Sequence, residues 1–145
     1  MRTKDNYINS MILEIPARSQ NESFARSAVC SFASQLDPTL EQIGELRIII
    51  SEAVTNCVVH AYKGTSGKVY ISAFLYSDRT VKIKIKDKGC GISDIERCME
   101  PFYTTDESGE RGGMGFPIMK ELSDRLSVNS KPGKGTTLTL IKKLG

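Results

Sequence analysis

The sequence SEAVTNCVVHAY, residues 51–62, decides the fold, because it places polar side chains at helical spacing within an apolar segment. Glu52 and Asn56 stand four residues apart and therefore share one face of the expected helix, with His60 one turn further. The amide oxygen of Asn56 is a hard ligand of the kind that Mg²⁺ prefers, and Glu52 could orient or deprotonate a nucleophile. Taken alone, the pair also fits a solvated helix face, and His60 also fits a cap or support of the helix end.

Three glycine-containing islands follow this segment, and each marks a bend where backbone can approach a ligand closely. They are DKGCG at 87–91, GGMG at 112–115 and GKGTT at 133–137. Asp87 could accept a hydrogen bond from an exocyclic amine such as that of adenine, while Gly89 and Gly91 admit the ring. Backbone amides at the start of the helix after the second island could face phosphate oxygens. Each island alone also fits an ordinary turn or helix start. Together, the four segments predict a site for a magnesium nucleotide.

Length and composition restrict the class of protein. The 145 residues suit one domain, residues 1–145, and a content of 39% hydrophobic and 26% charged residues is typical of a globular chain. The balance of 20 basic against 17 acidic residues is too mild to indicate nucleic-acid binding. The N-terminus lacks an apolar export segment, and no run approaches the roughly 18 apolar residues of a membrane span. We therefore expect a cytoplasmic protein whose partners are proteins or nucleotides.

The chain has four cysteines, Cys30, Cys57, Cys90 and Cys98. No two of them form a CxxC pair, and only one histidine is present, so a zinc site is not expected. We expect free thiols instead.

Two capping-box patterns predict where the first helices begin. Ser19–Glu22 opens a helix that should reach about Leu36, and Thr39–Gln42 opens a second helix that should reach about Ala61. The second helix carries the segment quoted above.

Strand signals complete the expected order of elements. Strands are expected at residues 7–15, 68–76, 80–86, 126–130 and 136–142, with the second and third forming a hairpin. In the third strand apolar residues alternate with Lys82, Lys84 and Lys86, which predicts that the lysines face water. A short helix is expected at 93–99, a polar lid at about 101–115 and a helix at about 115–126. This order predicts an α+β fold with helices over one face of a mainly antiparallel sheet.

Jointly, the four segments resemble the nucleotide-binding boxes of the GHKL ATPase and kinase superfamily. The sequence has no GxxxxGK[ST] motif and no HRD or DFG set, so it does not resemble a P-loop enzyme or a eukaryotic-type protein kinase. The resemblance implies the Bergerat fold, a two-layer α/β sandwich with helices on one face of a mixed, mainly antiparallel sheet. It also implies ATP or ADP and Mg²⁺ as cofactors, with Asn56 as the magnesium ligand, Asp87 as the adenine reader and Gly91 in the adenine pocket. The other nucleotide-binding positions implied are His60, Gly89, Thr104, Thr105, Gly112, Gly113, Met114, Gly115, Thr136 and Thr137, with Gly113 and Gly115 in the phosphate lid.

Almost the full length resembles one branch of that superfamily, the anti-sigma factor serine kinases, and especially its sporulation members. Matching segments include SQNESFAR at 19–26, QLDPT at 35–39, FYTT at 102–105 and GMGFPIM at 113–119. The resemblance implies that Glu52 is the catalytic base and that Arg111 contacts a phosphate, although Arg111 departs from the GxGxG lid of the wider superfamily. It also implies a homodimer that holds a sigma factor of the sigma-F type inactive and phosphorylates a serine of an anti-anti-sigma factor. Arg26 is then the candidate contact with the sigma factor.

Other functions remain open at this point. A hydrolytic ATPase whose lid closure drives a conformational cycle is one, since Glu52 could activate water as readily as a serine hydroxyl. A nucleotide-gated module that sequesters its partner without chemistry is another. Within the family, the nearest alternative is the related kinase that regulates the general-stress sigma factor, of the sigma-B type, although the short length and SQNESFAR favour the sporulation branch. The homodimer is expected to use the open edge or face of the sheet near residues 7–15.

Overall fold

The computed structural model describes residues 6–62, 66–91 and 115–145. In chain order the elements are β1 (Tyr7–Pro16), α1 (Gln20–Ala33), a 3₁₀ turn η1 (Ser34–Leu36), α2 (Leu40–Asn56), a π-helical turn η2 (Cys57–Ala61), β2 (Lys68–Tyr76), β3 (Thr80–Asp87), α4 (Gly115–Leu122), β4 (Arg125–Lys131) and β5 (Gly135–Lys143). The helix expected at 93–99 and all of the expected lid except Gly115 lie outside the described residues. None of the helices described is long and apolar enough to cross a membrane.

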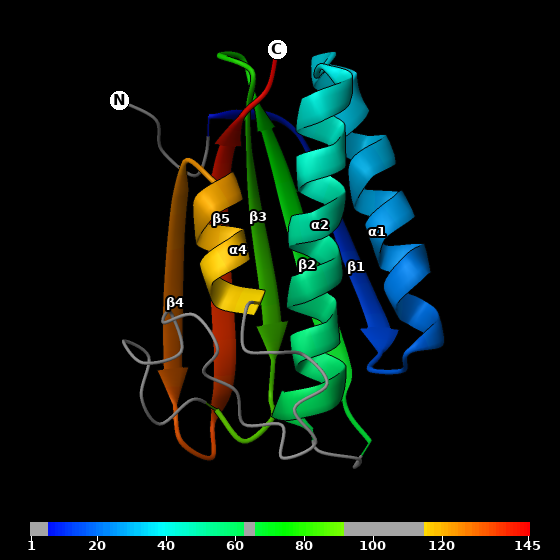
Figure 1. Ribbon diagram of the computed structural model, residues 1–145, viewed down its shortest axis with the longest axis vertical. Coiled ribbons are helices and arrows are strands. Elements are labelled where there is room, and N and C mark those ends of the chain that lie inside the picture. Colours follow the sequence, from blue (N-terminus) through cyan, green and yellow to red (C-terminus); the bar gives the residue numbers. More distant parts are fainter. Residues whose placement is uncertain (1–5, 63–65, 92–114) are drawn as a thin grey trace.

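The strands form one five-stranded sheet in the order β1-β2-β3-β5-β4. Every pairing between the described strands is antiparallel, so this part of the chain supplies no parallel pair of the kind that a mixed sheet contains. Helices α1, α2 and α4 all lie over one face of the sheet (Figure 1). The α+β sandwich predicted from the sequence is therefore confirmed, with an antiparallel rather than a mixed sheet among the described strands.

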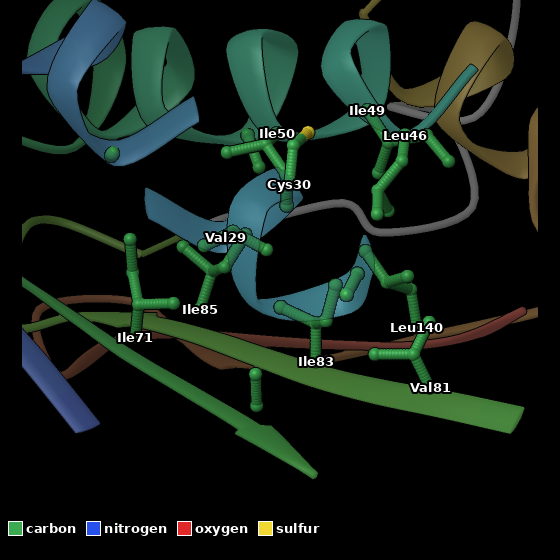
Figure 2. Packing of buried hydrophobic residues seen from close by; sticks show 14 of the residues in the cluster. Val29, Cys30, Leu46, Ile49, Ile50, Ile71, Val81, Ile83, Ile85 and Leu140 are labelled. Atoms are coloured by element: carbon green, nitrogen blue, oxygen red, sulfur yellow. The ribbon is translucent and has the colours of Figure 1, made fainter. Parts of the chain in front are cut away.

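The hydrophobic core fills the space between α2 and the central strands. Leu46, Ile49 and Ile50 are fully buried on α2, and they face side chains of the sheet (Figure 2). Ile83 and Leu140 are the fully buried neighbours on β3 and β5. Burying one such side chain contributes about 1.5–3 kcal/mol, so this layer fixes α2 on the sheet. The alternation in β3 is also confirmed, since its isoleucines are buried while Lys84 and Lys86 are exposed and Lys82 is half-buried.

The two predicted capping boxes have different outcomes. At Thr39 the box is complete, because the N–H of Gln42 donates to Thr39 Oγ1 (3.1 Å) and the N–H of Thr39 donates to Gln42 Oε1 (2.9 Å). At Ser19 the predicted helix does begin, at Gln20, but the capping box is absent, because Ser19 has helical backbone angles and its side chain makes no capping bond. Glu22, the other expected member of that box, accepts hydrogen bonds from Ser51 of α2 and Arg26 of its own helix instead. A tertiary contact thus replaces the local one.

The helix expected at 115–126 also differs from the structure, since α4 ends at Leu122. Arg125 and Leu126 belong to β4, where they pair with Ile141 and Leu140 of β5. Sheet pairing satisfies the backbone of these two residues and buries part of Leu126, which outweighs one further helical turn. The N–H and hydroxyl of Ser123 both donate to the carbonyl of Met119, which closes the helix end.

Lys142 is a charged side chain buried on the helix-covered face of β5. Its ammonium donates to Glu45 Oε1 of α2 (3.1 Å) and to the carbonyl of Leu122 at the end of α4 (2.7 Å). A buried charge is tolerated only when it is paired and hydrogen-bonded. Lys142 therefore joins β5, α2 and α4 through one nitrogen atom.

We expect Lys142→Ala to lower the free energy of unfolding by about 2–3 kcal/mol, because it leaves Glu45 without its cation and the Leu122 carbonyl without its donor. Urea denaturation followed by circular dichroism measures this change. Lys143→Ala, at the exposed next position of β5, is the matched control and should change the value by less than about 0.5 kcal/mol. Equal effects of the two substitutions would contradict the role given to the Lys142 ammonium.

Candidate nucleotide site

Helix α2 brings Glu52 and Asn56 to one end of the molecule, just before the helix passes into η2. Both side chains are half-buried and lie one turn apart. The Nδ2 atom of Asn56 is buried and has no hydrogen-bond partner among the residues that the structure describes. Buried amides are nearly always paired, so an amide without a partner is available to a ligand. Because rotation of an amide exchanges its oxygen and nitrogen, Asn56 fits the magnesium ligand that the sequence predicts.

The end of this helix has a form that the sequence did not indicate. The predicted helix does reach Ala61, but its last residues, Cys57–Ala61, are wound as a π-helix, and the N–H of Tyr62 donates to the carbonyl of Cys57 (3.4 Å). Single π turns within α-helices are frequent at functional sites. His60 lies half-buried within the turn. Cys57, the first residue of this turn, places its thiol 3.7 Å from Asp87 Oδ2 at the end of β3.

Asp87 is the last residue of β3, and 6% of it is exposed. Its Oδ1 accepts a hydrogen bond from the N–H of Gly89 (2.9 Å), and its Oδ2 accepts one from the Cys57 thiol (3.7 Å). Burial raises the pKa of the Asp87 carboxyl above its ordinary value, while the backbone amides of Gly89 and Thr136 and the Cys57 thiol act in the opposite direction. Burial, followed by the neighbouring Asp87 charge, raises the pKa of the Cys57 thiol, which therefore remains a proton donor.

Backbone contacts fix the loop that follows Asp87. The N–H of Cys90 donates to the carbonyl of Ala61 in η2 (2.8 Å), and the carbonyl of Cys90 accepts from the N–H of Gly133 (2.6 Å). A Cβ at Gly89 would lie 2.2 Å from the Ala61 carbonyl oxygen, and one at Gly91, where φ is 77°, would lie 2.2 Å from that of Lys131. Close packing of three backbone segments therefore requires both glycines, and the contact with an adenine ring that the sequence suggested stays a prediction.

Tyr62 is a residue of this region that sequence reasoning missed. Its hydroxyl donates to the carbonyl of Lys68 (2.6 Å) and accepts from the N–H of Lys88 (2.8 Å), so it joins the start of β2 to the loop after β3. In the sequence Tyr62 is only a single tyrosine at the end of the helical pattern. Tyrosines in such positions are too common to indicate a functional site. Tyr62 supports the loop and is buried.

The two predicted threonines separate onto the two faces of the sheet. Thr136 pairs with Asp87, and Thr137 pairs with Lys86. Because side chains alternate along a strand, Thr136 shares the helix-covered face with Asp87, whereas Thr137 faces the other side. The Thr136 hydroxyl is 2.8 Å from that of Ser130. A shallow hollow of about 170 Å³ lies at this end of the sheet, and Asp87, Thr136 and Thr137 are among its lining residues.

The segments that carry the described site residues meet at one end of the sandwich. The C-terminal end of α2, the end of β3 and the turn between β4 and β5 lie at the lower end of the view in Figure 1, and the N-terminal end of α4 faces the same way, nearer the middle of the view. The remaining predicted site residues, Thr104, Thr105, Arg111, Gly112, Gly113 and Met114, lie outside the described residues.

Arg26 lies on α1, outside this group of segments, but it is connected to α2. Its Nη1 donates to Glu22 Oε1 and its Nη2 to Ser23 Oγ, both at 3.4 Å, while its Nε is buried without a partner in the described part of the chain. The hydroxyl of Ser51, the residue before Glu52, donates to the same oxygen of Glu22. The candidate partner contact therefore lies two hydrogen bonds away from the helix that carries the predicted base.

The described cysteines agree with the expectation of free thiols. Cys30, Cys57 and Cys90 are unpaired, and Cys98 lies outside the described residues. Among the described side chains no group of three or more histidine, cysteine and acidic residues gathers in the manner of a metal cluster.

Comparison with known proteins identifies the family. Residues 41–145 match the model of the histidine kinase-, DNA gyrase B- and HSP90-like ATPases. The anti-sigma F factor of Caldanaerobacter subterraneus is 48% identical over 139 residues, which cover 96% of each chain. That of Bacillus subtilis is 49% identical over 137 residues, covering 94% of this chain and 93% of the relative. The crystal structure of the RsbU and RsbW domains of a Mycobacterium tuberculosis protein superposes with a TM-score of 0.68 over 94% of this chain and 32% of that one, at 19% identity, which is a likeness of fold alone. The chain therefore belongs to the histidine kinase-, DNA gyrase B- and HSP90-like ATPase family and, within it, to the anti-sigma F factors.

Proposed function

We propose that this chain is an anti-sigma factor and a serine protein kinase. It holds a sporulation sigma factor of the sigma-F type inactive, and it uses Mg-ATP to phosphorylate a serine of an anti-anti-sigma factor. The observation that carries the nucleotide part is the side chain of Asn56, which lies one turn after Glu52 and whose buried Nδ2 atom has no partner among the described residues. The relatives named above support the regulatory part.

The proposed roles of the nucleotide residues follow from their chemistry. Asp87 accepts a hydrogen bond from the exocyclic amine of adenine, since its carboxylate is held in place by backbone amides at the end of β3. Asn56 holds the magnesium ion, which, when bound, supplies positive charge against the phosphate oxygens. His60, Gly89, Gly91 and Thr136 line or support the pocket, and Thr137 lies on the far face of the sheet. The proposed phosphate contacts are Thr104, Thr105, Arg111, Gly112, Gly113, Met114 and Gly115.

In the proposed reaction, Glu52 accepts the proton of the incoming serine hydroxyl as that oxygen attacks the γ-phosphorus of ATP. The bond between the γ-phosphorus and the bridging oxygen breaks in line, and ADP leaves with the electron pair. Arg111 would stabilise the charge on the transferred group. The acceptor serine comes from another protein, and Arg26 contributes to the surface that binds the sigma factor. These partners act on transcription, so we place the protein in the cytoplasm.

Transfer from γ-labelled ATP tests the function directly. The protein is incubated with Mg²⁺ and labelled ATP, with and without the anti-anti-sigma protein of the same organism, and phosphopeptide mapping locates the label. We expect label on one serine of the added protein, and a loss of about a hundredfold or more in Asn56→Ala. Thr55→Val is the matched control on α2, because the Thr55 hydroxyl donates to the carbonyl of Ser51 in its own helix (2.7 Å).

The other outcomes of this assay distinguish the alternative functions. Free phosphate without labelled protein would indicate a hydrolytic ATPase. ATP that is bound but not consumed would indicate a nucleotide-gated binding module. Either result would refute the kinase.

Glu52→Gln tests the base separately from nucleotide binding. We expect the transfer rate at saturating ATP to fall by about 10²–10⁴-fold, with ATP affinity within about twofold of wild type, because the amide keeps the shape of the side chain but cannot take a proton. Glu41→Gln is the control, since Glu41 is an exposed carboxylate in the first turn of the same helix. A Glu52→Gln variant that transfers phosphate at the original rate would remove Glu52 from the mechanism.

We also propose that the homodimer forms through β1 and the sheet face beside it. β1 is an edge strand. Ile12 pairs with Ser72 on the face opposite the helices and is 80% exposed, and Ile8, at the irregularity between Tyr7 and Asn9, is 64% exposed. Large apolar side chains gathered on an exposed edge are typical of association surfaces. Ile12→Asp should therefore give a monomer in light scattering coupled to size exclusion. Leu40→Asp, at a position 92% exposed at the start of α2, should leave the dimer intact. A dimer that survives Ile12→Asp would place the interface elsewhere.

A further inference from the structure

Cys57 and Asp87 come from different elements and meet at the nucleotide end of the fold. Cys57 is the first residue of η2, next to Asn56, and Asp87 is the last residue of β3. Both are buried, and the Cys57 sulfur lies 3.7 Å from Asp87 Oδ2, within reach of an S–H···O hydrogen bond. The role proposed above for Asp87 leaves this thiol without an assignment.

The acceptor positions of the carboxylate are almost all accounted for. An ionised carboxylate offers about four lone-pair positions. The N–H of Gly89 donates to Oδ1, the N–H of Thr136 also donates to the carboxylate, and the Cys57 thiol donates to Oδ2. Counting the donors in the described part of the chain, about one position then remains, which suits a single N–H of an exocyclic amine. Two of the three protein donors are backbone amides fixed by the strand pairing and the loop, so the thiol is the only side chain among them.

We propose that Cys57 is a positioning residue for nucleobase recognition: its thiol fixes Oδ2 of Asp87 so that the carboxylate presents its remaining acceptor position to the 6-amino group of adenine. This inference rests on the proposed function. Without the thiol, the carboxylate keeps its two backbone donors but can turn about its Cβ–Cγ bond. Part of its interaction with the amine is then lost, while contacts to the ribose and the phosphates are unchanged.

Two substitutions separate this role from simple filling of the core. Cys57→Ala removes the donor and leaves a small side chain, whereas Cys57→Ser keeps a donor at nearly the same place. Cys30→Ala removes another buried thiol, from α1 within the apolar core (Figure 2), and controls for the loss of packing. Thermal melting of all three variants establishes that they are folded at the temperature of the binding assay.

Affinity is measured by calorimetry with Mg-ATP and with the triphosphate of purine riboside, which lacks the 6-amino group. We expect Cys57→Ala to raise the Kd of ATP about five- to tenfold, as for the loss of one charge-assisted hydrogen bond, and to leave the Kd of the analogue within about twofold. Cys57→Ser should bind both nucleotides within about twofold of wild type. The transfer rate at saturating ATP should not change in either variant, because Cys57 acts on binding of the base.

The opposite results identify which idea fails. Equal losses for ATP and for the analogue in Cys57→Ala, or a loss in Cys57→Ser as large as in Cys57→Ala, would reduce Cys57 to a packing role and overturn this inference while leaving the proposed function intact. A wild type that binds ATP no better than the analogue would remove Asp87 as the adenine reader. A wild type that binds neither nucleotide would overturn the proposed function and this inference with it.

Discussion

The packing of α2 on the central strands is the constraint on which the rest of the structure depends. Leu46, Ile49 and Ile50 are buried on the same helix that carries Glu52 and Asn56 one to two turns later. Because a helix is stiff over this length, fixing its apolar face against β3 and β5 also fixes the direction of its polar residues. Lys142 adds a polar contact from β5 to the same helix. The core therefore positions the residues of the candidate site that α2 carries.

Most of the fold could be predicted from the sequence because its local signals agree with its tertiary contacts. The alternation in β3 matches burial on one face, and the Thr39 capping box forms as expected. The predictions failed where a distant residue competed with a local one. Glu22 bonds to Ser51 rather than capping its own helix, and Leu126 pairs with Leu140 rather than extending α4. Neither competitor is visible in a window of neighbouring residues.

In the candidate site, too, residues with a local sequence signal could be predicted, and residues that depend on distant contacts could not. Glu52, Asn56 and Asp87 could be selected from the sequence because their segments occur together with the two later glycine-containing segments, although each segment alone also fits an ordinary helix face or turn. The contacts of Cys57 and Tyr62 could not be predicted, since their partners Asp87 and Lys88 lie 30 and 26 residues further along the chain and only folding brings them close. At Gly89 and Gly91, neighbouring backbone occupies the space that a side chain would need, which is a reason for glycine that the sequence did not indicate.

The chain of contacts from Arg26 through Glu22 to Ser51 has a thermodynamic consequence. One carboxylate oxygen of Glu22 accepts hydrogen bonds from the Arg26 guanidinium on α1 and from the Ser51 hydroxyl on α2. An acidic group of a partner that binds Arg26 must therefore compete with Glu22 for the guanidinium. Such an exchange alters the charge balance beside Ser51, the residue that precedes Glu52. If the exchange changes the affinity for nucleotide by some factor, linkage requires that nucleotide change the affinity for the partner by the same factor. Binding of the partner at Arg26 and binding of nucleotide would then be thermodynamically coupled through the shared oxygen atom of Glu22.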